Sequence, residues 1–132
     1  MPRRAVIAII LYNGKTLMGK KRSDSPKFLA GEWYLLGENV EGEESDAEAL
    51  KRGTREEVGL EIEVGQCVGT DKSPSGKDVK YYECFAKSDR ITVGSDLEEA
   101  MWVESSRVLD YCGEKIKGLM SEQIREYFLR QA

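Results

Sequence analysis

Residues 52 to 60 read Arg-Gly-Thr-Arg-Glu-Glu-Val-Gly-Leu, and the interpretation of the whole chain starts from this stretch. Glu56 and Glu57 are adjacent carboxylates near the end of a predicted helix that Gly59 closes. Two such carboxylates make a site for a hard divalent cation, which prefers oxygen ligands. Gly53 lies three and four residues before the pair, so it shares their helical face.

The start and the end of this helix can both be predicted. Ser45 and Glu48 form a capping box, in which the two side chains satisfy free backbone donors at the helix start. Gly59 suits the left-handed conformation that ends many helices. We therefore expect a helix from about Asp46 to Val58. Its apolar stripe, at spacings of three and four, consists of Ala47, Leu50, Thr54 and Val58.

The remaining pattern predicts a sheet. Asn13-Gly14 is a two-residue hairpin signal between strands at 5–12 and 15–21. Loops or turns are predicted at 23–31, with Pro26, and at 72–78, with Pro74 and Gly76. Further strands are predicted at 33–36, 62–70, 79–87 and about 101–103.

A second helix is predicted near the C-terminus, with one apolar face formed by Ile116, Leu119, Met120, Ile124, Tyr127 and Phe128. A mixed sheet with two main helices is an α+β sandwich. The 132 residues fit one domain, 1–132, with a single core.

Composition narrows the function classes. The net charge of −4 disfavours binding to a nucleic acid polymer, which usually needs a basic face. The three cysteines, Cys67, Cys84 and Cys112, are odd in number and widely spaced, and histidine is absent, so we expect buried free thiols rather than disulfides or a zinc site. No signal peptide and no membrane span of about 20 apolar residues is recognisable. We expect a cytoplasmic protein that does not bind membranes.

Residues 37–60 resemble the Nudix box, the loop-helix-loop motif of hydrolases that act on nucleoside diphosphates linked to another group. The family's pattern is G-x5-E-x7-R-E-U-x-E-E-x-G-U, in which U is a bulky aliphatic residue. The residues that match it are Glu44, Arg52, Glu56, Glu57, Gly59 and Leu60. The flanks agree too, with Val40-Glu41 in the loop, Gly31-Glu-Trp33 before it, and the acidic segment and Trp-Val pair of residues 98–103. The resemblance implies a Nudix-type α/β/α sandwich with a mixed β-sheet.

Three positions depart from the pattern. The first motif glycine is Glu38, the glutamate after the motif arginine is Gly53, and the aliphatic position is Thr54. In the family, three helix glutamates hold Mg²⁺ or Mn²⁺, so Gly53 removes one ligand. A glycine inside a helix also costs about 1 kcal/mol relative to alanine.

The resemblance implies roles for the other motif residues. Glu56, Glu57 and the backbone carbonyl of Glu38 would bind metal, and Arg52 would order the loop by pairing with Glu44. Glu98 or Glu99 would supply a further ligand or the general base. For this pair an exposed acidic turn is the equally simple alternative.

Substrate contacts are less specific. Lys20, Lys21 and Arg22 could meet phosphates at a strand end, and they could equally be solvated there. Trp33, Tyr81 and Tyr82 could stack on a base, although aromatic residues on strands more often belong to the core.

The sequence leaves three possibilities open, two of which are functions and one of which concerns the origin of the chain. The first is a Mg²⁺- or Mn²⁺-dependent hydrolase that cleaves a phosphoanhydride in a small nucleotide or its derivative, weakened by Gly53. The second is a nucleotide-binding or regulatory module that has lost catalysis. The third is an altered version of an active parent, with Glu38 and Gly53 among the changes. A homodimer is compatible with the resemblance, and the substrate cannot be read from the motif.

Overall fold

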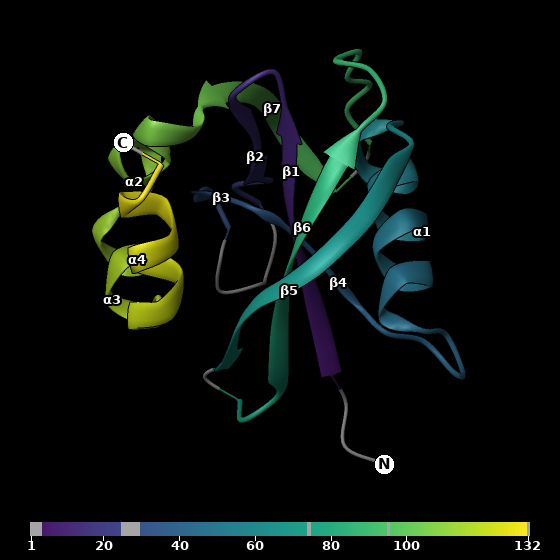
Figure 1. The fold of residues 1–132 in the computed structure, drawn as a ribbon, viewed down its shortest axis with the longest axis horizontal. Coiled ribbons are helices and arrows are strands. Elements are labelled where there is room, and N and C mark those ends of the chain that lie inside the picture. Colours follow the sequence, from purple (N-terminus) through teal and green to yellow (C-terminus); the bar gives the residue numbers. More distant parts are fainter. Residues whose placement is uncertain (1–3, 25–29, 74, 95, 132) are drawn as a thin grey trace.

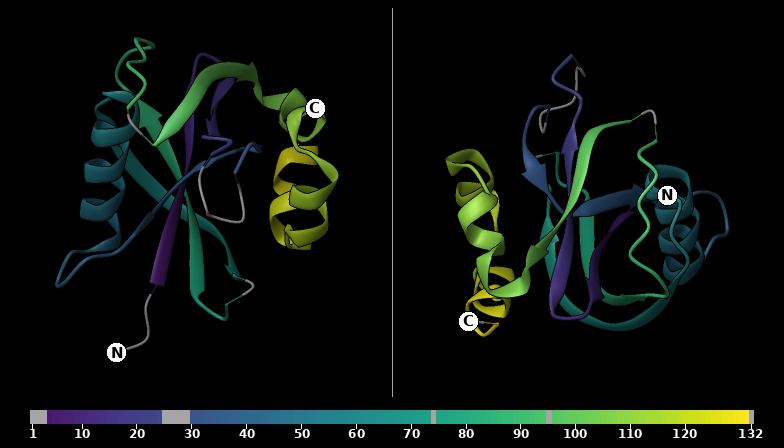
Figure 2. Two further views of the ribbon diagram at one scale, coloured as in Figure 1. Left: turned by 180° about the vertical axis from the view of Figure 1, so that it is seen from behind. Right: turned by 90° about the horizontal axis from the view of Figure 1, so that it is seen from above.

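A mixed β-sheet forms the centre of the molecule, with helices on both faces (Figures 1 and 2). The computed structural model describes residues 4–24, 30–73, 75–94 and 96–131. The predicted loop prolines, Pro26 and Pro74, lie outside these ranges. The strands are β1 (Arg4–Tyr12), β2 (Lys15–Lys21), β3 (Trp33–Tyr34), β4 (Leu36–Asn39), β5 (Ile62–Lys72), β6 (Asp78–Ala86) and β7 (Leu97–Glu104). The helices are α1 (Asp46–Val58), α2 (Val108–Tyr111), α3 (Glu114–Leu119) and α4 (Glu122–Leu129), and a 3-10 turn covers Ser105–Arg107.

The order of hydrogen-bonded strands is β3-β2-β1-β6-β5, with β4 paired to β1 and β7 paired to β2. β1 and β6 run parallel, whereas the other pairs among the described strands are antiparallel. The hairpin between β1 and β2 turns at Asn13 and Gly14, whose φ angles of 49° and 76° are those that a tight two-residue turn requires. The predicted hairpin is confirmed.

Each face of the sheet has its own core. Alternate residues of β1 point to opposite faces. Val6, Ala8 and Ile10 pack with α1, whereas Ile9 packs with the C-terminal helices. The right-hand view of Figure 2 shows the sheet between these two helical layers. The predicted α/β/α sandwich is therefore observed.

Two predicted elements are divided. The strand expected at 33–36 is interrupted at Leu35, because β3 pairs with β2 while β4 pairs with β1. The single C-terminal helix was a wrong prediction. The chain becomes extended at Met120, with φ −73° and ψ 133°, and Ser121 caps the start of α4. As a result Leu119 is 47 % exposed rather than part of the apolar face.

Two strands are longer than predicted. β5 extends two residues beyond the prediction, and β7 is much longer than the segment expected around 101–103. Cys84 and Cys112 are buried free thiols as expected, but Cys67 is exposed, which corrects the prediction for that residue. In the described part of the chain, no helix is long and apolar enough to cross a membrane.

Candidate functional site

Helix α1 is fixed at both ends. The backbone N–H of Glu48 donates to Ser45 Oγ at 3.1 Å, and the Ser45 N–H donates to Glu48 Oε1 at 2.9 Å, which is the predicted capping box. Gly59 adopts φ 69° and its N–H donates to the Arg55 carbonyl. Near the helix start, Asp46 accepts a hydrogen bond from Arg4 Nε at 2.8 Å and another from the Tyr82 hydroxyl. The predicted helix bounds are confirmed, and the last turn carries Glu56 and Glu57.

Arg52 joins the helix to the loop that precedes it. Its Nε and Nη2 donate to Glu44 Oε2 and Oε1 at 2.8 and 3.0 Å, and Nη2 also donates to the Asn39 carbonyl at 3.0 Å. Glu44 Oε1 in turn accepts from the Glu41 N–H at 3.0 Å. The hydrogen bond from Arg52 lowers the pKa of Glu44 to about 2, and the same bond raises the pKa of Arg52. The ion pair that the sequence suggested is present and orders the loop.

The two helix glutamates have different surroundings. Glu57 is 6 % exposed, whereas the Glu56 side chain is 61 % exposed and its Oε2 lies 3.6 Å from Arg52 Nη1. Burial of a carboxylate removes its hydration, so a buried carboxylate is favourable only with compensating polar or cationic contacts. The pair therefore combines one buried carboxylate with one exposed carboxylate.

A segment that precedes β7 runs against the last turn of α1. The Gly94 N–H donates to the Glu57 carbonyl at 2.7 Å, and the Thr92 N–H donates to the Val58 carbonyl at 2.9 Å. A Cβ at Gly94 would lie 2.5 Å from the Glu56 carbonyl oxygen, so only glycine allows this approach. The sequence pattern did not predict this contact, because it joins residues almost forty positions apart.

The side chain of Glu38 lies against Gly53. A Cβ built on Gly53 would lie 2.7 Å from Glu38 Oε2 and 2.9 Å from its Cγ. Glu38 Oε1 lies 3.5 Å from Arg52 Nη1 and accepts from the Asn39 N–H at 3.2 Å. Sequence reasoning considered only the backbone carbonyl of Glu38 and missed this carboxylate, although the two departures from the motif pointed to both residues.

The later acidic pair lies beside β2. Lys20 Nζ is 3.2 Å from Glu98 Oε2 and 4.0 Å from Glu99 Oε2. The hydrogen bond from Lys20, with a second from the Ser23 N–H, lowers the pKa of Glu98. A carboxylate with a lowered pKa is a weak proton acceptor, so these contacts favour a ligand or structural role for Glu98 over that of a base.

The basic and aromatic candidates already have partners within the protein. Arg22 pairs with Asp24 at 3.1 Å, and Lys20 pairs with the acidic residues just described. Trp33 is part-buried against the core on the α3/α4 side of the sheet. Their roles toward a substrate therefore stay predictions.

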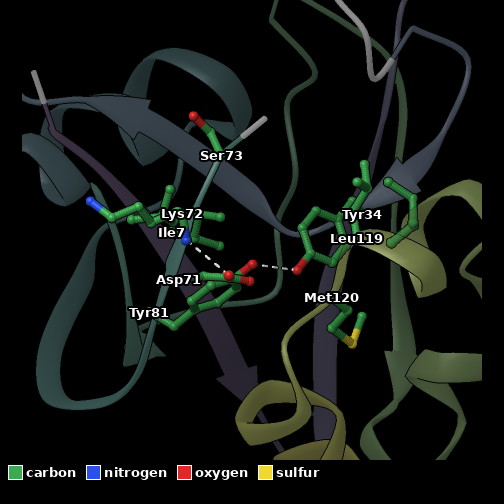
Figure 3. A pocket seen from close by; sticks show the side chains of 10 residues that line it. Ile7, Tyr34, Asp71, Lys72, Ser73, Tyr81, Leu119 and Met120 are labelled. Atoms are coloured by element: carbon green, nitrogen blue, oxygen red, sulfur yellow. Dashed lines mark hydrogen bonds between the residues drawn. The ribbon is translucent and has the colours of Figure 1, made fainter. Parts of the chain in front are cut away.

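A pocket that the sequence did not predict opens between the sheet and the C-terminal helices (Figure 3). Its volume is about 210 Å³ and its lining is mostly apolar. The Tyr34 and Tyr81 hydroxyls are hydrogen-bonded at 2.6 Å within it, and burial raises the pKa of Tyr81 to about 12. The lining residues are Ile7, Tyr34, Asp71, Lys72, Ser73, Val79, Tyr81, Ile116, Leu119 and Met120. These residues come from segments far apart in the sequence, so no local sequence pattern could have predicted the pocket.

No three Asp, Glu or Cys side chains in the described ranges converge closely enough to hold a metal ion in this arrangement. Glu38 and Glu56 are instead both directed to Arg52 Nη1. The donor chemistry still suits a hard cation, because carboxylate oxygens are the preferred ligands of Mg²⁺. The Glu56 side chain is exposed, so a cation from solvent can reach its carboxylate.

Comparison with known proteins agrees with this geometry. The NUDIX domain family matches residues 1–123. The CTP pyrophosphohydrolase of Escherichia coli strain K12 is 32 % identical over 108 residues, which cover 80 % of this chain and 78 % of that protein. The E. coli nucleoside triphosphatase NudI is 22 % identical over 125 residues, covering 84 % of this chain and 89 % of the relative.

Solved structures show the same fold. A NUDIX hydrolase from Nitrosomonas europaea superposes with a TM-score of 0.78 at 18 % identity, covering 96 % of this chain and 70 % of that one. A NUDIX-family hydrolase from Clostridium perfringens gives 0.74 at 16 % identity, covering 99 % and 96 %. The domain match over most of the chain, the relative at 32 % identity and the Arg52–Glu44 loop-helix geometry lead to one conclusion: this chain belongs to the Nudix hydrolase family.

Proposed function

We propose that this protein is a pyrophosphohydrolase that cleaves a phosphoanhydride in a nucleoside triphosphate or a nucleoside diphosphate derivative, with Mg²⁺ or Mn²⁺ as cofactor. The observation that carries the proposal is the ordered loop-helix unit, in which Arg52 binds Glu44 in bidentate fashion beside the Glu56-Glu57 pair. A functional site needs its residues held in position by such supporting contacts, which is what this unit supplies to the Glu56-Glu57 pair.

Glu56, Glu57 and the backbone carbonyl of Glu38 would hold the cation. The bound cation would neutralise charge on the diphosphate and polarise phosphorus toward attack by water. Arg52 would orient the loop before α1 through Glu44, and Glu56 would exchange its contact with Arg52 for the cation. Glu99, whose nearest cation is 4.0 Å away, is less tightly engaged than Glu98 and is the better candidate for a proton acceptor.

The apolar pocket is a candidate binding site for the nucleoside. Gly37 pairs with Ile7, which lines the pocket, whereas the next residue, Glu38, pairs with Val6, which packs on the α1 side. The pocket therefore lies on the opposite face of the sheet from the Glu38 side chain, so a nucleoside there would have to extend its phosphates around β4 to reach the carboxylates. Lys20, Arg22 and Trp33 are further candidates for substrate contacts, after release from their present partners.

The substrate panel follows from the relatives. CTP, the substrate in the name of the E. coli relative, is the first compound to test, followed by other nucleoside triphosphates, ADP-ribose and dinucleoside polyphosphates. Wild type with Mg²⁺ should release phosphate or pyrophosphate from at least one of these. Glu57→Gln should reduce the rate by about 100-fold or more, because it removes a charged metal ligand. Glu43→Gln, an exposed change in the same loop, serves as control. Absence of product at high enzyme concentration would contradict the proposal.

Gly53 favours a second candidate function, that of a nucleotide-binding module without turnover. This alternative predicts that calorimetry detects binding of a panel nucleotide to wild type while product formation is absent. Turnover that depends on Mg²⁺ and Glu57 would exclude it.

A further inference from the structure

The motif has glycine at position 38 and glutamate at position 53, and this chain has the two residues exchanged, as Glu38 and Gly53. We propose that the side-chain carboxylate of Glu38 replaces the missing carboxylate of residue 53 as a metal ligand. The inference rests on the metal site of the proposed function, and it assigns to Glu38 a side-chain role in addition to that of its backbone carbonyl.

The Glu38 side chain and residue 53 compete for the same space. Glu38 Oε2, Cγ and Cβ would lie 2.7, 2.9 and 3.1 Å from a Cβ on Gly53. Real side chains do not approach this closely, so the carboxylate of Glu38 occupies the volume in which a side chain at 53 would begin. Glycine at 53 therefore leaves room for the Glu38 side chain in this position, whereas a larger residue at 53 would make Glu38 move.

The Glu38 side chain points from β4 toward α1. Along a strand, successive side chains alternate between the two faces of a sheet. Glu38 pairs with Val6, a fully buried residue of the α1-side core, so its side chain points to the helix. Residues 53, 56 and 57 share one helical face, which brings the Glu38 carboxylate to the face that carries Glu56 and Glu57.

Glu38 and Glu56 share one positively charged neighbour, Arg52. Arg52 Nη1 lies 3.5 Å from Glu38 Oε1 and 3.6 Å from Glu56 Oε2, so these two oxygens are no farther apart than the sum of the two distances. One guanidinium nitrogen thus draws both carboxylates to the same side of α1, where a cation could take the place of its charge. The exchange leaves the number of carboxylates in the site unchanged, with one now supplied by β4 instead of α1.

The partial burial of Glu38 fits this role. Its side chain is 21 % exposed, compared with 61 % for Glu56, and Oε1 is fixed by the Asn39 N–H. The other carboxylate oxygen, Oε2, lies against Gly53 of α1. A ligand fixed by its backbone neighbour loses less conformational freedom when it binds.

The test is a set of variants at both positions, measured for Mn²⁺ affinity by electron paramagnetic resonance titration as well as for hydrolysis. Glu38→Gln keeps the size of the side chain and removes its charge, and we expect Mn²⁺ affinity to fall by at least about tenfold. The Mn²⁺ affinity of Glu38→Gly should fall by a similar factor. Adding Gly53→Glu to Glu38→Gly restores the family arrangement and should recover Mn²⁺ affinity to within a few-fold of wild type.

Gly53→Glu alone is expected to perturb the site, because two side chains would then compete for one volume. Glu43→Gln, an exposed residue of the same loop, should leave Mn²⁺ affinity unchanged and controls for the loss of one negative charge. Circular dichroism of each variant verifies the fold, and recovery in the double variant separates a ligand effect from misfolding.

The outcomes separate this inference from the proposed function. Wild-type Mn²⁺ affinity in Glu38→Gln, or no recovery in the folded double variant, would overturn the inference. Wild type that hydrolyses no nucleotide but binds Mn²⁺ in a Glu38-dependent way would overturn the proposed function and support the inference.

Discussion

Arg52 and Glu44, eight residues apart, form two parallel hydrogen bonds of 2.8 and 3.0 Å across the junction between the loop and α1. The planar guanidinium matches a carboxylate at both nitrogens, which makes the pair directional as well as attractive. It fixes the loop that follows β4, the strand of Glu38, relative to the helix that carries Glu56 and Glu57.

Arg52→Lys tests this positioning role. Lysine keeps the positive charge but cannot form the bidentate contact or reach the Asn39 carbonyl at the same time. We expect kcat/KM to fall by about tenfold or more, as is typical when partners of metal ligands are lost. Arg55→Lys is the matched control, because Arg55 makes a similar bidentate pair with Glu61 on the exposed surface. Equal effects of the two changes would contradict the special role of Arg52.

The Arg52–Glu44 pair should also make stability depend on pH. The pKa of Glu44 is about 2 in the folded protein, below its ordinary value of 4.5. The folded state therefore favours the ionised form, so the stabilisation is complete above pH 4.5 and is lost as the pH falls toward 2.

Comparison with Glu44→Gln isolates this contribution from that of other carboxylates. The free energy of unfolding, measured in urea, should be lower for the variant at pH 7, and the difference from wild type should shrink between pH 4.5 and 2. A difference that stays constant with pH would refute the linkage.

Gly94→Ala should destabilise the protein. The new Cβ would lie 2.5 Å from the Glu56 carbonyl oxygen, so the backbone must shift, at a cost of about 1–3 kcal/mol in the free energy of unfolding. Gly118→Ala is the control. A Cβ at position 118 would meet no atom within 4 Å outside its own helix and chain neighbours, and alanine in a helix is favoured by up to about 1 kcal/mol. Urea unfolding of the two variants should thus shift in opposite directions.

The three cysteines should react at different rates. Cys67 is exposed, whereas Cys84 and Cys112 are buried and burial raises their pKa to about 12 and about 11. Since the thiolate is the reactive form, a maleimide or Ellman's reagent should modify one thiol rapidly and the other two only on unfolding. Mass spectrometry after a short exposure checks the site, and rapid labelling of Cys84 in the native protein would contradict its burial.

The parts of the fold that depend on local chemistry were predictable. Asn13-Gly14, the Ser45–Glu48 box and Gly59 each act within a few residues of the chain, and all three form as expected. The division of the predicted strand at Leu35 was not predictable, because it depends on which of two strands pairs with each half. The break at Met120 was hidden by a continuous apolar spacing that the chain satisfies with two short helices.

The candidate site shows the same limit. The register of Glu44, Arg52, Glu56 and Glu57 follows from the motif. The contact between Glu38 and Gly53 depends on the pairing of β4 with β1 and on the packing of α1 over that sheet. Sequence spacing treats the two departures as separate losses, whereas in space they are one arrangement.

That arrangement has a consequence for how such sequences can diverge. Of the four combinations of glycine and glutamate at positions 38 and 53, two glutamates compete for one volume, and two glycines leave the face with Glu56 and Glu57 alone. The two mixed combinations supply one further carboxylate, from β4 or from α1, without that competition. Among relatives of this chain, the two positions should therefore change together, so that the identity of residue 38 predicts that of residue 53.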